Sequence, residues 1–182
     1  MRPRQITFPT GGGAQSVTLE AADGSVVNID NTATATEIFA GNVPALGADD
    51  YVEILILFDC QNINLGSNAT FQMQATLGST EVFNKTTANL TSNASRRDGW
   101  IVLRIYNKGA TNSQGAQGTM FVGGASGWTG NLAIYVIDEG AGGAEDMTSS
   151  KALSITMKLS QADADFEFRK FYAAMKVYKV GA

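Results

Sequence analysis

The stretch 151–179, KALSITMKLSQADADFEFRKFYAAMKVYK, constrains the fold more than any other part of the chain. Its first half alternates apolar and polar residues, which is typical of a strand with one buried face. The buried positions would be Leu153, Ile155, Met157 and Leu159. The second half is apolar on both faces, with Phe166, Phe168, Tyr172 and Tyr178 on one side and Phe171, Met175 and Val177 on the other. This second strand therefore needs a second cover, either another sheet or another subunit.

Strand patterns recur along the rest of the chain, whereas helix patterns are nearly absent. We expect strands at Gln5–Phe8, Ser16–Glu20, Ser25–Ile29, Tyr51–Cys60, Ala69–Leu77, Glu81–Lys85, Gly99–Asn107, Gly118–Val122, Leu132–Ile137, Ala152–Leu159 and Phe166–Lys179. The only window with helical character is Asn31–Ala40, and it lacks a convincing helical period. Short strands with glycine-rich connections and no intervening helices predict an all-β protein, an antiparallel β-sandwich of jelly-roll type.

The turns and the length suggest how the chain is divided. Its 182 residues are enough for one domain with a sizeable core, which we place at 14–182. The first 13 residues end in the triple glycine Gly11–Gly13 and are interpreted as a flexible arm. The sequence Ala21–Gly24 before the run SVVNI indicates a tight hairpin.

Composition excludes several classes of function. The formal net charge is −4, which disfavours a nucleic-acid partner held by phosphate contacts. Only 16% of the residues are charged, so the surface is polar but carries little charge, as in proteins packed against neighbours. No apolar run approaches the roughly 20 residues of a membrane span, and the N-terminus lacks the apolar core of a secretory leader. We expect no membrane partner and a protein made without a leader.

The sequence contains no histidine, which removes the commonest general base and transition-metal ligand. The single cysteine, Cys60, ends the apolar run YVEILILFDC and is interpreted as a small buried hydrophobe rather than a nucleophile. Acidic pairs such as Asp49–Asp50 and Glu145–Asp146 lack the spacing of a calcium loop, and acidic residues are common in turns. We therefore predict no catalytic residue, no metal site and no cofactor, and the chain is expected not to be an enzyme.

The aromatic residues and the two-faced strands point to contacts between subunits. Trp100, Phe171 and Met175 have no obvious cover within the chain and are predicted to lie at the subunit interface of a homotrimer. Trp100, Trp128, Tyr106 and Tyr135 are also the residues that would line a sugar-binding face, although at strand spacing such aromatics more often belong to a core or a subunit interface.

Two stretches, QNINLGSNATFQMQATLGSTEVF and ALSITMKLSQADADFEFRKFYAAMKVYK, resemble those of jelly-roll decoration proteins, also called cement proteins, of tailed-phage heads. The resemblance covers most of the chain from about Tyr51 onward and lies in its polar, histidine-poor strands that finish in a long aromatic one. It implies a homotrimer seated on the major capsid protein at the virion surface and assembled in the host cytoplasm.

In this interpretation the arm Met1–Gly13 docks on the capsid or on a neighbouring copy. Arg2 and Arg4 precede the short apolar run from Ile6 to Phe8, and these four residues are the predicted docking contacts. Two other classes stay open, which are the receptor-binding tip of a phage fibre or tailspike and a free carbohydrate-binding module.

Overall fold

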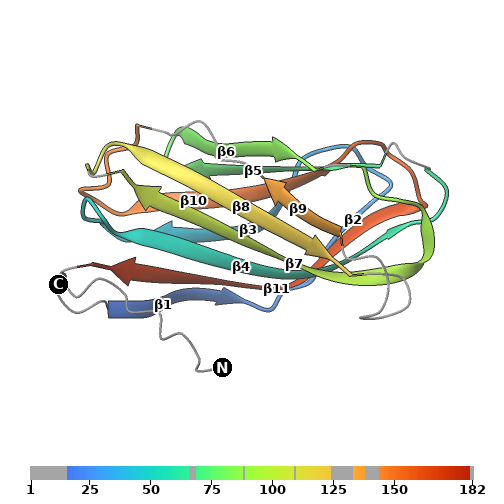
Figure 1. Ribbon diagram of the computed structural model, residues 1–182, viewed down its shortest axis with the longest axis horizontal. Helices are drawn as coiled ribbons and strands as arrows, with labels where there is room; N and C mark the ends of the chain where they lie inside the picture. Colours follow the sequence, from blue (N-terminus) through green and yellow to red (C-terminus); the bar gives the residue numbers. More distant parts are fainter. Residues whose placement is uncertain are drawn as a thin grey trace, which may run out of the picture.

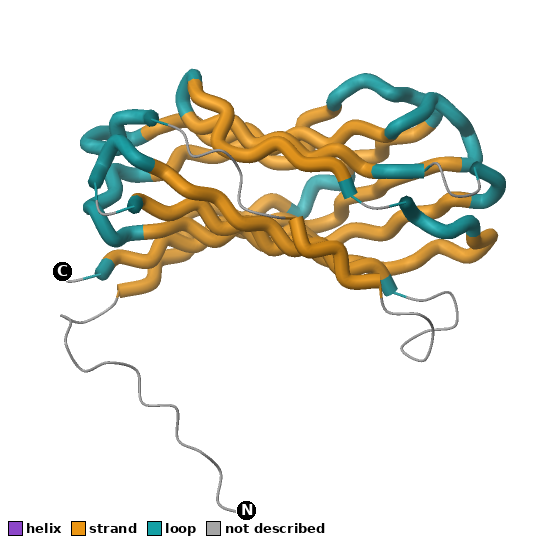
Figure 2. Tube along the Cα trace, turned by 45° about the horizontal axis from the view of Figure 1, so that its top comes forward, coloured by secondary structure: helices purple, strands orange, loops and turns teal. Residues whose placement is uncertain are grey.

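The computed structural model describes residues 16–65, 69–87, 89–108, 110–123, 133–137 and 144–180, with only the backbone described for 133–137. These residues form two stacked layers of β-strands, and none of them belongs to a helix (Figures 1 and 2). The strands are β1 (Ser16–Asp23), β2 (Val27–Asp30), β3 (Thr36–Val43), β4 (Tyr51–Asn62), β5 (Phe71–Leu77), β6 (Thr80–Thr86), β7 (Asn93–Asn107), β8 (Gln114–Val122), β9 (Ala133–Ile137), β10 (Lys151–Leu159) and β11 (Phe166–Lys179).

The strand order is that of a jelly roll. The larger sheet has the order β1-β11-β4-β7-β8-β9, with β2 also paired to β11, and the smaller sheet has the order β3-β10-β5-β6. Every strand pairing is antiparallel. The chain crosses repeatedly between two four-strand units, and β8 and β9 extend the larger sheet beyond β7. The predicted all-β, jelly-roll sandwich is confirmed.

Alternating side chains fill one core between the sheets. On β10, the side chains of Leu153, Ile155, Met157 and Leu159 are buried, as the alternation in the sequence predicts. From the larger sheet Phe166 and Phe168 reach Phe71 of the smaller sheet, with ring centroids 5.2 Å and 5.5 Å away. Aromatic pairs in this range add packing energy beyond the apolar area that they bury.

A β-bulge in β11 overturns the predicted faces of this strand. The register with β4 shifts between Lys170 and Tyr172, so Phe171 is the extra residue. One extra residue moves every later side chain to the opposite face. Met175 therefore joins Phe166 in the core, where it is fully buried against Gly41 of β3. The prediction that Met175 is a subunit contact is wrong, because the chain's own smaller sheet covers it.

Three local features differ from the sequence predictions. No strand was predicted at β3, which buries Ile38 and Phe39 and lies mostly in the window with weak helical character; the threonines of that window are β-branched residues that suit a strand. The residues around Gly24 do not make a hairpin, since β1 and β2 both pair with β11 and follow one another along its edge. Strand β7 starts at Asn93 rather than Gly99, because its polar first residues extend beyond the core.

Candidate functional sites on the larger sheet

The exposed large hydrophobic side chains of the described residues gather along one edge of the larger sheet. They are Val17 and Leu19 on β1, Val26 before β2, Phe171 on β11 and Val180 directly after it, with exposures from 38% for Phe171 to 61% for Val26. Figure 1 shows β1 in blue at the margin of the sheet, beside the dark red β11. We call these five residues the docking edge.

The backbone of the docking edge is open as well. Within the described part of the chain, β1 pairs with β11 on one side and with no strand on the other. Unpaired N–H and C=O groups of an edge strand are a template for pairing with another chain, and proteins usually blunt such edges with charges or bulges. Here Glu20 and the bulge between Leu19 and Ala21 limit the flat part to Ser16–Leu19.

An ion pair between the buried Lys170 and the partly exposed Asp23 fastens the docking edge to β11. The Lys170 side chain is fully buried, and its Nζ lies 2.5 Å from Asp23 Oδ2 and 3.2 Å from Ser25 Oγ. Asp23 Oδ1 also accepts a hydrogen bond of 2.7 Å from the Ser25 backbone N–H. These hydrogen bonds, the one from Lys170 above all, lower the pKa of Asp23 from 3.8 to about 2. The position where β1 passes into β2 is therefore held by charge as well as by backbone pairing.

The outer face of the larger sheet carries a second group of apolar residues. Tyr172, Leu57, Trp100 and Phe121 lie in one row across β11, β4, β7 and β8, and all are half-buried. The rings of Trp100 and Phe121 are nearly parallel, with centroids 5.5 Å apart. At the other end of the same face Tyr51 and Tyr178 stack with centroids 4.4 Å apart and an interplanar angle of 5°.

A shallow groove of about 250 Å³ lies on this face over the paired strands β7 and β8. It is lined by Trp100, Val102, Arg104, Gln117 and Thr119. Arg104 forms an ion pair of 2.8 Å with Glu53 of β4, and both its Nε and its Nη2 face that carboxylate. The groove therefore combines an aromatic ring with neutral hydrogen-bonding groups and one neutralised cation.

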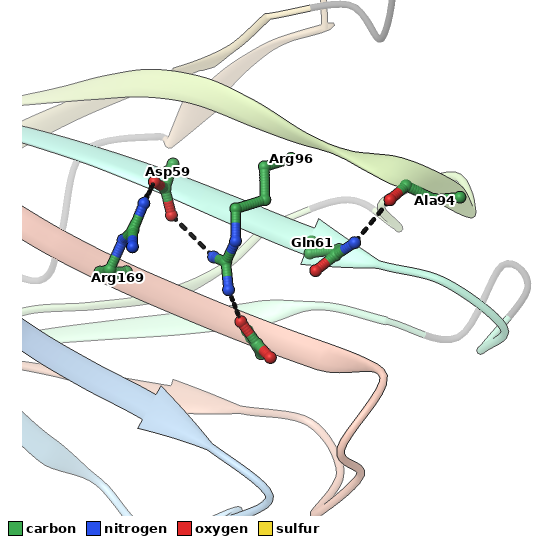
Figure 3. A network of polar contacts seen from close by, with 6 residues as sticks. Asp59, Gln61, Ala94, Arg96 and Arg169 are labelled. Carbon is green, nitrogen blue, oxygen red and sulfur yellow. Dashed lines mark hydrogen bonds and ion pairs between the residues drawn. The ribbon is translucent and has the colours of Figure 1, made fainter.

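A network of charged residues ties three strands of the same face together (Figure 3). Asp59 of β4 is nearly buried and pairs with Arg96 of β7 at 2.9 Å and with Arg169 of β11. Arg96 pairs in addition with Glu167. The hydrogen bond to Asp59 raises the pKa of Arg169. Two cations meet two carboxylates here, so the network stabilises the sheet and leaves no net charge for a ligand.

The structure does not bring the predicted interface residues together. Phe171 lies on the docking edge, Met175 lies in the core, and Trp100 lies on β7, separated from β11 by β4. The predicted contacts between the arm and the capsid, which are Arg2, Arg4, Ile6 and Phe8, lie outside the described residues, as does the whole arm. Nothing in the sequence marks Val17 and Leu19 as exposed, because their alternation in Ser16–Glu20 is the same as that of a strand facing a core.

The cysteine and two of the acidic residues considered in the sequence are buried or paired within the fold. Cys60 is buried, and this burial raises the pKa of its thiol to about 12. Asp50 accepts hydrogen bonds from the backbone N–H groups of Gly47 and Val180, and Glu145 pairs with Lys151. In the described ranges no three acidic or thiol side chains are grouped to hold a metal ion. None of the described residues belongs to a helix long and apolar enough to span a membrane.

No model of a known protein family matches the sequence, and no curated protein matches it. Among solved structures the chain is similar to the VP2 subviral particle of infectious bursal disease virus, with 13% identity over 99% of this chain and 38% of that chain, at a TM-score of 0.41. It is also similar to the CBM2 module of the evolved Dit of Lactobacillus casei BL23 phage J-1, with 6% identity over 79% of this chain and 69% of that chain, at a TM-score of 0.38. It is similar to peanut lectin as well, with 6% identity over 97% of this chain and 96% of the lectin chain, at a TM-score of 0.35.

The chain spans less than half of the length of the infectious bursal disease virus chains that it matches, between 35% and 47%. With these identities and TM-scores, the likenesses concern the general layout of a β-sandwich and not its function.

Proposed function

We propose that this chain is a structural protein of a virion, a decoration protein on the outer surface of a tailed-phage head. In this proposal three copies assemble around a three-fold axis, and the homotrimer sits on the major capsid protein and reinforces the lattice. The chain has no catalytic role, and it is made and assembled in the host cytoplasm.

The observation that carries the proposal is the docking edge. Val17, Leu19 and Val26 are each more than half exposed on one margin of the sheet, while the core of the same chain is closely packed. Scattered exposed apolar residues need no explanation, whereas a group of them beside an unpaired strand marks an interaction surface. Burying a valine or leucine side chain contributes about 1.5–3 kcal/mol, and a closed trimer repeats each contact three times.

The first strand of the docking edge, β1, starts at Ser16, shortly after Met1–Gly13 in the sequence. We propose that it docks on the capsid or on a neighbouring copy through Arg2, Arg4, Ile6 and Phe8. Ordering such a segment costs about 1–2 kcal/mol per residue, which the contacts on the lattice have to exceed.

The proposal is tested by adding the purified protein to empty heads of the virus whose genome encodes it. We expect the full chain to bind the heads and to protect them against heat, and a version lacking Met1–Gly13 to keep its fold but to bind more weakly. Equal protection by both versions would remove the role of the arm. If neither version binds heads, the decoration role fails and the tip of a fibre or tailspike becomes the better candidate.

A further inference from the structure

We propose that the groove over β7 and β8 binds a short oligosaccharide of uncharged sugar units, with one sugar ring placed on Trp100. This site lies beyond the proposed role in assembly, because its lining residues come from β7 and β8 and none of them belongs to the docking edge. Strands β11 and β4 separate β7 from β1, although Leu19 and Arg104 lie on the same outer face and in the same cross-strand row.

The aromatic end of the groove suits the apolar face of a sugar ring. A pyranose presents C–H groups on one face and hydroxyl groups around its rim, and C–H groups pack favourably on a flat π-system. Trp100 is half-buried, and one face of its ring stacks on Phe121 at 5.5 Å, so the part of the indole that stays exposed is the surface for the sugar. An aromatic side chain fixed by a neighbour loses little freedom when a ligand binds it.

The polar end of the groove suits the hydroxyl groups of the same ligand. Gln117 and Thr119 alternate on β8 with core residues, so both side chains point to the outer face, and both are accessible. Gln117 supplies an amide donor and acceptor, and Thr119 supplies a hydroxyl group that can do either. Arg104 is four residues from Trp100 on β7, which places the two ends of the groove about 13 Å apart along the strand.

The charge of the groove favours a neutral ligand. The carboxylate of Glu53 neutralises the Arg104 guanidinium at 2.8 Å, and the other four lining side chains carry no charge. An anionic ligand would have to compete with Glu53 for the cation, and a purely apolar ligand would leave Gln117 without hydrogen bonds. The volume of about 250 Å³ is below the roughly 300–1,000 Å³ of pockets for drug-sized molecules, so the groove takes a small unit at a time.

The test is titration calorimetry of the full chain with hexasaccharides of glucose, galactose, mannose and N-acetylglucosamine, and with hyaluronan fragments as a charged probe. We expect at least one neutral hexasaccharide to bind more tightly than about 1 mM and the charged probe to bind less well. Trp100→Ala should weaken binding at least about tenfold, and Gln117→Ala, an exposed position whose replacement leaves the core untouched, should weaken it severalfold. Phe171→Ala on the docking edge is the matched control and should bind as the unmodified chain does.

Several outcomes would overturn this inference. One is that no neutral hexasaccharide binds at millimolar concentration. Another is binding that survives both Trp100→Ala and Gln117→Ala. A third is dissociation of the assembled protein by Trp100→Ala in sedimentation, because Trp100 would then be a subunit contact as the sequence predicts. Failure of head binding alone would count against the proposed assembly role and leave the saccharide groove in place.

Discussion

Replacing Asp23 with asparagine leaves the ammonium group of Lys170 buried without its counter-charge. The Lys170 side chain has no exposed surface, and the carboxylate of Asp23 lies 2.5 Å from its Nζ. Breaking a buried ion pair by removing one partner costs about 3–5 kcal/mol. Because the Asp23 side chain is 36% exposed and Ser25 Oγ remains as an acceptor, we expect a smaller loss of about 2–3 kcal/mol in the free energy of unfolding.

Asparagine is the appropriate replacement because its side-chain oxygen can still accept the hydrogen bond from the Ser25 backbone N–H, so the turn is kept. The assay is urea unfolding followed by circular dichroism. Asp30→Asn on the neighbouring β2, where the side chain is exposed, is the matched control and should change stability by less than about 0.5 kcal/mol. Lys170→Met, which fills the same space without a charge, should cost little.

The double variant Asp23→Asn with Lys170→Met separates charge from packing. We expect it to recover most of the stability lost in Asp23→Asn, because no buried charge then remains unpaired. A loss below about 0.5 kcal/mol in Asp23→Asn would refute the reasoning, as would a double variant whose loss equals the sum of the single losses.

Three further results are expected. Asp23 has its pKa lowered to about 2 in the folded protein, so its contribution to stability is present above about pH 4 and is lost as the pH falls towards 2; acid titrations of the unmodified chain and Asp23→Asn should converge over that range. Cys60, with its buried thiol and a pKa near 12, should not react with iodoacetamide at pH 8 until urea unfolds the protein, and rapid labelling of the folded chain would contradict its burial. Gly78→Ala should destabilise the protein by about 1 kcal/mol or more in urea unfolding, because Gly78 has a φ of 60° and an added Cβ would lie 2.6 Å from the Glu145 carboxyl carbon; an unchanged midpoint would show that the turn adapts.

The fold was predictable because period-two alternation is a local property. The buried residues of β10 follow directly from the alternation of Leu153 to Leu159, and the absence of helical periods excludes the other fold classes. The bulge at Phe171 was not predictable, since this strand carries apolar residues on both of its faces and no glycine or proline marks the extra residue. The error about Met175 follows from that single shift of register.

The exposure of the docking edge could not be predicted for a different reason. Val17 lies on the outer face of the larger sheet opposite Tyr178, and its exposure depends on which face the core covers and on which strand ends the sheet. Topology decides both, rather than the sequence near Val17. For Lys170 a signal did exist. It stands two and four residues after Phe168 and Phe166, so strand periodicity places it on the same buried face, although a lysine is normally taken to be exposed.

Sedimentation equilibrium of the full chain and of Leu19→Asp tests most directly whether the docking edge joins copies of this protein. Leu19 is 58% exposed in the single chain, so the substitution should leave the fold intact, which circular dichroism can verify. We predict a mass three times the 19.2 kDa of one chain for the unmodified protein at micromolar concentration, and the mass of one chain for Leu19→Asp. A monomeric unmodified protein, or a trimer that persists in folded Leu19→Asp, would contradict the assembly role of this edge.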